Sequence, residues 1–86
     1  MRTRFELESA ANDAIYNHMT DRNAVDAAMA LSLASARYYA NSEYASGLTM
    51  GMHAMDAERA DRIERLADVG RAAMIDAAHG EGVRAA

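Results

Sequence analysis

The stretch of sequence that decides the fold is AVDAAMALSLASA, residues 24–36. Alanine is interleaved here with valine, leucine and methionine, so a helix formed by this segment is apolar on nearly all of its sides. A helix that is hydrophobic all round needs cover on every side and belongs in the interior of a protein or an assembly. We therefore predict that this segment lies at the centre of the fold or of a dimer.

Alanine is also the dominant residue of the whole chain, whose 86 residues are 51% hydrophobic and include no proline, cysteine or tryptophan. Alanine has the highest helix propensity and buries little surface. The composition therefore predicts an all-α protein with closely packed helices and a thin core. A chain of this length cannot divide such a core between two domains, so we expect a single helical domain over residues 1–86. Without cysteine there are no disulfides, which leaves oligomerisation or docking onto another protein as support for the small core.

Capping residues mark the first helix and the start of the second. Thr3 and Glu6 fit a capping box that begins a short helix over residues 6–19. The sequence Thr-Asp-Arg-Asn at 20–23 then predicts a stop and a restart, because these side chains compete with the backbone inside helices and satisfy helix ends. Asp21 or Asn23 caps the second helix.

The end of the second helix is expected at Ser46-Gly47, since glycine suits the left-handed conformation that closes many helices. A second possibility is an earlier end at Asn41-Ser42. The third helix is expected over residues 49–79, with a frayed tail from about residue 80. The predicted fold is a three-helix domain, a short first helix followed by a long alanine-rich helical hairpin, and we expect it to form a homodimer.

Residues 56–68 form a run in which acidic residues and arginine are mixed. We interpret this run as the solvated face of the third helix, with Glu64 on it, opposite an apolar stripe that includes Ile63 and Leu66. The alternative is a surface that recognises a basic partner. The near balance of acids and arginines argues against mimicry of a nucleic acid.

Two histidines are followed three residues later by an aspartate, as His18…Asp21 and His53…Asp56. On a helix this spacing places both side chains on one face, as in helical metal sites. Carboxylate-bridged bundles also need several Glu ligands and Glu-x-x-His pairs, which the chain lacks. We therefore expect no metal and no other cofactor.

Motifs for catalysis, nucleic-acid binding and membrane insertion are missing from the chain. No serine lies in a Gly-x-Ser-x-Gly elbow and no glycine-rich phosphate loop occurs, so we expect no enzyme. The net charge is −4 and all nine basic residues are arginines mixed with acids, which disfavours direct nucleic-acid binding. The most apolar window is too short to span a bilayer, so we expect a cytoplasmic protein.

A partner-binding surface is predicted at Arg37, Tyr38, Tyr39, Glu43 and Tyr44. Tyrosine and arginine are favoured at protein interfaces because each combines contact area with directional hydrogen bonds. The alternative is that this segment is the end of the bundle and packs within its own domain.

Met50, Met52 and Met55 cluster in the same region and allow two interpretations. Methionine is flexible and suits an adaptable binding surface, but it also fills gaps in cores. Because Met52 and Met55 fall on the apolar stripe of the third helix, we favour the core.

The most consistent function is that of a non-enzymatic, protein-binding regulator or inhibitor. Small acidic helical proteins without cofactors are often phage or mobile-element products that block a host protein, an analogy of size and composition. The alternatives are a structural subunit of a larger assembly and a small metal- or ligand-binding helical bundle. In the predicted dimer, Tyr38, Tyr39 and Leu31 or Leu33 lie near the contact.

Overall fold

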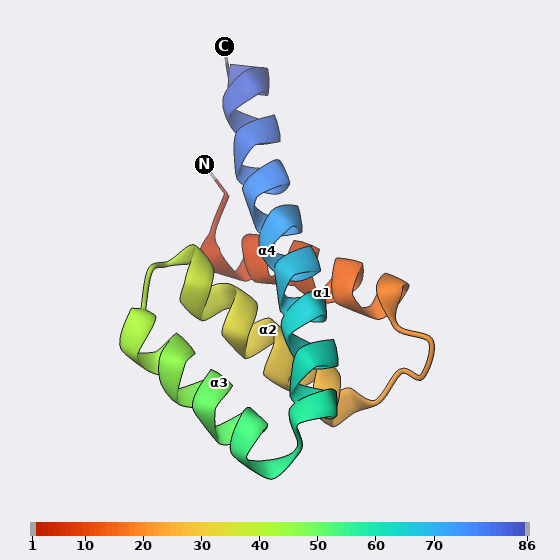
Figure 1. The fold of residues 1–86 in the computed structure, drawn as a ribbon. Coiled ribbons are helices and arrows are strands. Elements are labelled where there is room, and N and C mark those ends of the chain that lie inside the picture. The colour runs from red at the N-terminus through yellow and green to blue at the C-terminus, as the bar shows by residue number, and fades with distance from the viewer. Residues whose placement is uncertain (1, 86) are drawn as a thin grey trace.

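The computed structural model describes residues 2–85, and the side chains of residues 2–80. This part of the chain forms four helices and no strand: α1 (Arg4–His18), α2 (Ala24–Tyr38), α3 (Ser42–Met55) and α4 (Ala57–Ala85) (Figure 1). The all-α prediction is confirmed. The three-helix prediction is wrong, because the chain breaks at residues 39–41 and again at Asp56 instead of at Gly47.

The two predicted N-terminal caps are confirmed. Thr3 and Glu6 form a reciprocal capping box, in which each side chain accepts a hydrogen bond from the other residue's backbone N–H. The Asn23 side chain accepts from the N–H groups of Val25 and Asp26 at the start of α2. Each cap satisfies donors that a helix leaves free in its first turn.

The α2 helix ends in a Schellman motif instead of continuing to residue 45. The N–H of Asn41 donates to the carbonyl of Ala36 at 2.8 Å, and the N–H of Ala40 donates to Arg37 at 3.2 Å. This motif requires a left-handed residue, and Ala40 supplies it with φ of 57°. Asn41 then caps α3 by accepting from the N–H of Tyr44. The earlier of the two predicted ends is therefore the one adopted.

A single residue separates α3 from α4. The backbone of Asp56 is extended, and its side chain accepts a hydrogen bond from the N–H of Arg59 at 3.1 Å in the first turn of α4. Gly47 and Thr49, expected at the break, lie inside α3. At the other end, α4 continues past Gly80 to Ala85, and the expected fraying of the tail stays a prediction.

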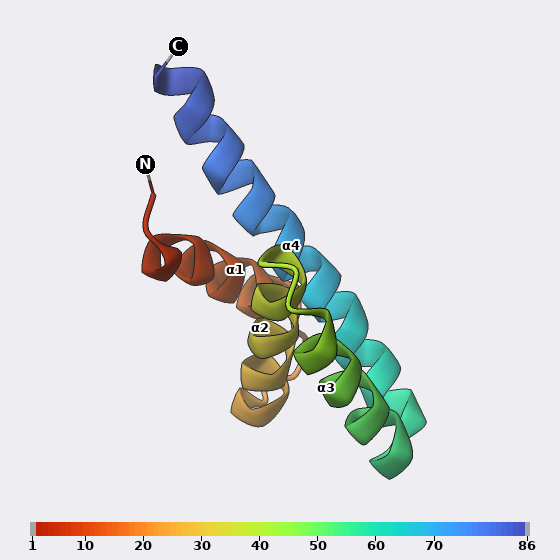
Figure 2. The same cartoon turned by 90° about the vertical axis from the view of Figure 1, so that its left-hand side faces the viewer.

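The long helix α4 is the support on which the other three helices pack (Figures 1 and 2). The α2 helix contacts α1 on one side and α3 on the other, as well as α4. Its position between three helices agrees with the apolar pattern of residues 24–36. Within residues 2–85, no helix combines the length and the apolar character needed to cross a lipid bilayer.

Small side chains make up most of the core. The largest fully buried residues are Ile15, Leu33, Ile63 and Met74. Alanines fill most of the remaining buried positions, which are Ala11, Ala27, Ala30, Ala34, Ala36, Ala45, Ala60 and Ala67. The predicted thin core is therefore present, and the helices must approach closely to exclude water from it.

Gly70 of α4 lies in tight contact with α1 and α2. A Cβ atom placed on Gly70 would lie 2.9 Å from Cδ1 of Ile15 and 3.2 Å from Cβ of Ala34. Ile15 is completely buried, and the Cβ of Ala34 moves only with its backbone. A side chain at position 70 would therefore have to displace packed neighbours, which favours glycine there although it lowers helix propensity.

We predict that Gly70→Ala lowers the free energy of unfolding by about 1–2 kcal/mol, because overpacking outweighs the gain in helix propensity. Urea unfolding followed by circular dichroism measures the change. The matched control is Gly51→Ala in α3, where an added Cβ meets nothing within 4 Å. This control should gain about 0.5–1 kcal/mol. Equal stabilisation of both variants would contradict the tight contact at Gly70.

We predict that Ala40→Gly, at the end of α2, raises the free energy of unfolding by about 0.5–1 kcal/mol, whereas Gly70→Ala lowers it. Glycine adopts a positive φ without the steric cost that a Cβ imposes. The control is Ala72→Gly, at an exposed position in the middle of α4, which should lower stability by a similar amount. Loss of stability in Ala40→Gly would show that the left-handed turn is not formed in solution.

Candidate functional site

The structure divides the predicted partner surface between two environments. Arg37 faces α4, where its guanidinium bonds Glu64 at 2.9 Å and Asp68 at 3.2 Å. Glu43 and Tyr44 are exposed in the first turn of α3, and the exposed fraction of Tyr44 is 51%. Arg37 therefore has a role within the domain, whereas the α3 residues are accessible to a partner.

Tyr38 and Tyr39 form an aromatic pair at the end of α2. Their ring centroids lie 4.9 Å apart in an edge-to-face arrangement. The guanidinium of Arg4, on α1, lies 4.4 Å from the centroid of Tyr39. These contacts tie the end of α2 to α1, although Tyr39 remains 39% exposed.

The predicted dimer contacts also differ in accessibility. Leu33 is completely buried within the chain and is not available to a second copy, which corrects that part of the prediction. Leu31 and Tyr38 are partly exposed. Dimerisation itself stays a prediction.

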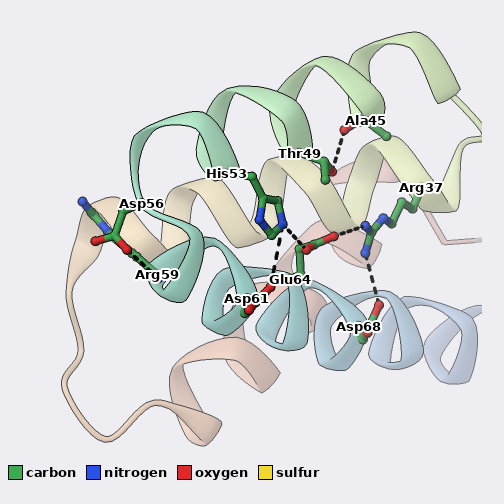
Figure 3. A network of polar contacts seen from close by, with 9 residues as sticks. All are labelled: Arg37, Ala45, Thr49, His53, Asp56, Arg59, Asp61, Glu64 and Asp68. Atoms are coloured by element: carbon green, nitrogen blue, oxygen red, sulfur yellow. Dashed lines mark hydrogen bonds and ion pairs between the residues drawn. The ribbon is translucent and has the colours of Figure 1, made fainter.

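Glu64 is the centre of a polar network that joins three helices (Figure 3). Its Oε1 accepts a hydrogen bond from Arg37 of α2, and its Oε2 lies 2.7 Å from Nε2 of His53, on α3. Nε2 of His53 is also 3.8 Å from Oδ1 of Asp61. Both oxygens of the Glu64 carboxylate are therefore occupied, each by a different helix.

These contacts set the charge state of Glu64. The hydrogen bond from His53 lowers the pKa of Glu64 below its ordinary value of 4.5, burial opposes this change, and Arg37 adds to the lowering. The carboxylate stays ionised at neutral pH and can hold an imidazolium, a guanidinium or a cation.

The charged run of α4 is thus only in part a solvated face. Glu64 binds α2 and α3 as described above, and Arg59 donates from Nε to Oδ1 of Asp26 at 2.7 Å. The interpretation of Glu64 as a solvated residue is wrong, because α3 folds back onto this side of α4.

In the structure, neither of the two histidine–aspartate pairs of the sequence forms a site. Asp56 caps α4 and lies apart from His53 (Figure 3). His18 instead has its Nδ1 bonded to the carbonyl of Ala14. The partners of His53 are Asp61 and Glu64, three residues apart on α4. The three-residue spacing of Asp61 and Glu64 can be seen in the sequence. Their contact with His53 cannot, because it depends on the turn at Asp56.

An apolar groove runs between α2 and α3. Its lining contains no charged side chain and consists of Ala24, Val25, Ala28, Met29, Ser32 and Leu48. Val25 is 59% exposed. Along α3, Tyr44 and Met55 lie on the same side as Leu48 by their helical spacing, so this side of α3 carries further apolar side chains.

The three methionines of this region separate into core and surface. Met52 is buried, whereas Met50 is 72% exposed and Met55 is 90% exposed. The prediction of a core position is confirmed for Met52 and wrong for Met55, because the third helix of the prediction is divided at Asp56 and its stripe does not continue across the break.

We predict that Glu64→Gln lowers the free energy of unfolding by about 1–2 kcal/mol at pH 7, because it removes the negative charge that Arg37 and His53 share at a half-buried position and leaves an amide oxygen for only one of them. Because the folded-state pKa of Glu64 is lowered, its contribution is present above the unfolded pKa and is lost as the pH falls below about 4.5. Urea unfolding from pH 7 to pH 3 should therefore show a smaller loss for Glu64→Gln than for the unmodified chain.

The control for this prediction is Asp76→Asn, which removes a negative charge at an exposed position of the same helix. It should change stability by less than about 0.5 kcal/mol. Identical pH profiles for Glu64→Gln and the unmodified chain would contradict the role of Glu64.

No protein-family model, no curated protein and no solved structure matches this chain.

Proposed function

We propose that this chain is a non-enzymatic, protein-binding regulator or inhibitor that acts in the cytoplasm and binds its partner through the α2–α3 groove. The observation that carries the proposal is the uncharged lining of this groove, in which Val25 and Ala28 are exposed. Exposed apolar surface of this kind marks interaction sites in small proteins.

The residues around the groove support binding of a protein. Tyr44 lies one turn before Leu48, and tyrosine is enriched among residues that dominate interface energies. Met55 lies two turns after Leu48 on the same side, and a flexible thioether can adapt to a partner's surface. Together they give a strip of apolar side chains along α3 beside the groove, a shape that suits a helix of the partner.

Other hollows on the described surface have a different chemistry. The groove beside the α1–α2 connection contains Asp21, Asp26, Arg62 and Arg65, and the one next to Phe5 contains Glu8 and Asp13. Charged side chains in these places lose hydration when a partner covers them, which raises the cost of docking there. The α2–α3 groove is therefore favoured as the docking surface.

The test of this proposal is the substitution Val25→Asp. Val25 occupies the second position of α2, where a carboxylate is favourable to the helix, so the variant should keep its fold. A photo-reactive group at position 28 identifies the partner in the native host. The purified partner should then bind Val25→Asp at least about fivefold more weakly, a loss of about 1 kcal/mol.

The matched control is Phe5→Asp, which replaces an exposed apolar residue at the second position of α1, away from the groove. It should bind the partner normally. Equal binding by Val25→Asp and the unmodified chain would overturn the proposed surface. A crosslink only between two copies of the chain, together with a dimer in sedimentation, would replace the regulator by a self-assembling subunit.

A further inference from the structure

Three potential metal ligands converge between α3 and α4. They are Nε2 of His53 and one carboxylate oxygen each from Asp61 and Glu64, and these atoms all lie within 4.8 Å of one another (Figure 3). His53 and Asp61 are accessible from solvent, with side chains 35% and 59% exposed. An ion can therefore reach the three atoms.

The fold holds these side chains on one side of the α3–α4 pair. Asp61 and Glu64 are three residues apart, so they project from the same face of α4. His53 lies in the last turn of α3, and the single residue Asp56 turns the chain so that α3 runs back along α4. The ligand atoms come from two packed helices instead of a loop, which limits how far they can separate.

The charges around the three residues favour a divalent cation. The cluster contains the carboxylates of Asp61, Glu64 and Asp68 and the guanidinium of Arg37, so with a neutral imidazole it carries an excess of two negative charges. Arg37 bonds Oε1 of Glu64 and Oδ1 of Asp68. Arg37 thereby fixes the orientation of the Glu64 carboxylate, whose Oε2 faces His53. Hydrogen-bonding neighbours orient metal ligands in the same way.

We propose that His53, Asp61 and Glu64 form a binding site for a divalent first-row transition metal ion, with Zn²⁺ as the representative. Zinc binds histidine nitrogen and carboxylate oxygen at about 2.0–2.2 Å, so ligands at tetrahedral positions lie about 3.4 Å apart. The present separations of 2.7 Å for His53–Glu64 and 3.8 Å for His53–Asp61 lie on either side of this value. Side-chain rotations bring the atoms to it, and water takes the fourth position.

Binding of the ion requires the lone pair of Nε2 of His53, the atom that now faces Glu64. Nε2 of His53 must give up its hydrogen before it can coordinate the metal: in a neutral imidazole the hydrogen moves to Nδ1, and in an imidazolium, which already carries a hydrogen on Nδ1, it is released to solvent. Protons therefore compete with zinc, and the apparent affinity falls as the pH is lowered. This site does not depend on the proposed protein-binding function, because the apolar groove uses other residues.

The experiment is a titration of the purified full chain with zinc chloride at pH 7.5, followed by calorimetry, and with cobalt chloride, followed by visible absorption. We expect one ion per chain, a rise in melting temperature, and cobalt d–d bands characteristic of low coordination number. His53→Ala and Asp61→Asn should each lower the zinc affinity at least about tenfold. Asp61→Asn keeps the test valid if His53→Ala loosens α3, since the Asp61 side chain is largely exposed.

The matched control is His18→Ala, which removes a histidine from the last turn of α1 and leaves the three ligands in place. It should bind zinc as the unmodified chain does. Absence of saturable binding would overturn the site and leave His53, Asp61 and Glu64 as an ion-pair cluster only. Zinc binding that is equally strong in His53→Ala and Asp61→Asn, or that is lost in His18→Ala, would also overturn it.

Discussion

The contact of Gly70 with Ile15 and Ala34 is the constraint on which the packing of this protein depends. Because Gly70 has no side chain, α4 can lie against both Ile15 of α1 and Ala34 of α2 at this one position. The buried alanines of α2 likewise leave room for neighbouring helices to pack against it. A core built in this way gains less from each buried side chain than a leucine-rich core does. Its stability therefore depends on a close fit of the side chains. A single methyl group added at Gly70 would disturb the packing of α1, α2 and α4.

The α3 helix is held by a different type of interaction. Only Ala45 and Met52 of this helix are buried, so apolar contacts alone attach it weakly. The bond between His53 and Glu64 supplies a second attachment near its end, and Arg37 connects the same carboxylate to α2. Half-buried charge-assisted hydrogen bonds contribute more than exposed ion pairs, because solvent screens them less. The polar network thus compensates for the small apolar area that an alanine-rich helix offers.

The sequence predicts the features of this fold that are encoded locally. The caps at Thr3 and Asn23 are recognised because each side chain bonds backbone groups two or three residues away. The end of α2 is harder to predict, since alanine rarely adopts the positive φ of Ala40 and Gly47 offers a stronger but misleading signal. Asp56 is one of many acidic residues in its region, and nothing nearby distinguishes it as a cap. Without the break at Asp56, the sequence does not show which side of the helix carries Glu64, and the contact between Glu64 and His53 cannot be predicted.

Placing α3 correctly changes the functional interpretation of the whole region. In one continuous helix, Met55 would lie on the apolar stripe and Glu64 on the solvated face. In the structure, the two sides of α3 have separate roles. Leu48 lines the apolar groove with α2, while His53, five residues later and about 140° around the helix axis, faces the carboxylates of α4. The helix with the fewest buried residues therefore contributes to both the apolar groove and the polar cluster. Any change that moves α3 on α4 alters the shape of the groove as well, because Leu48 and His53 are carried by the same rigid element.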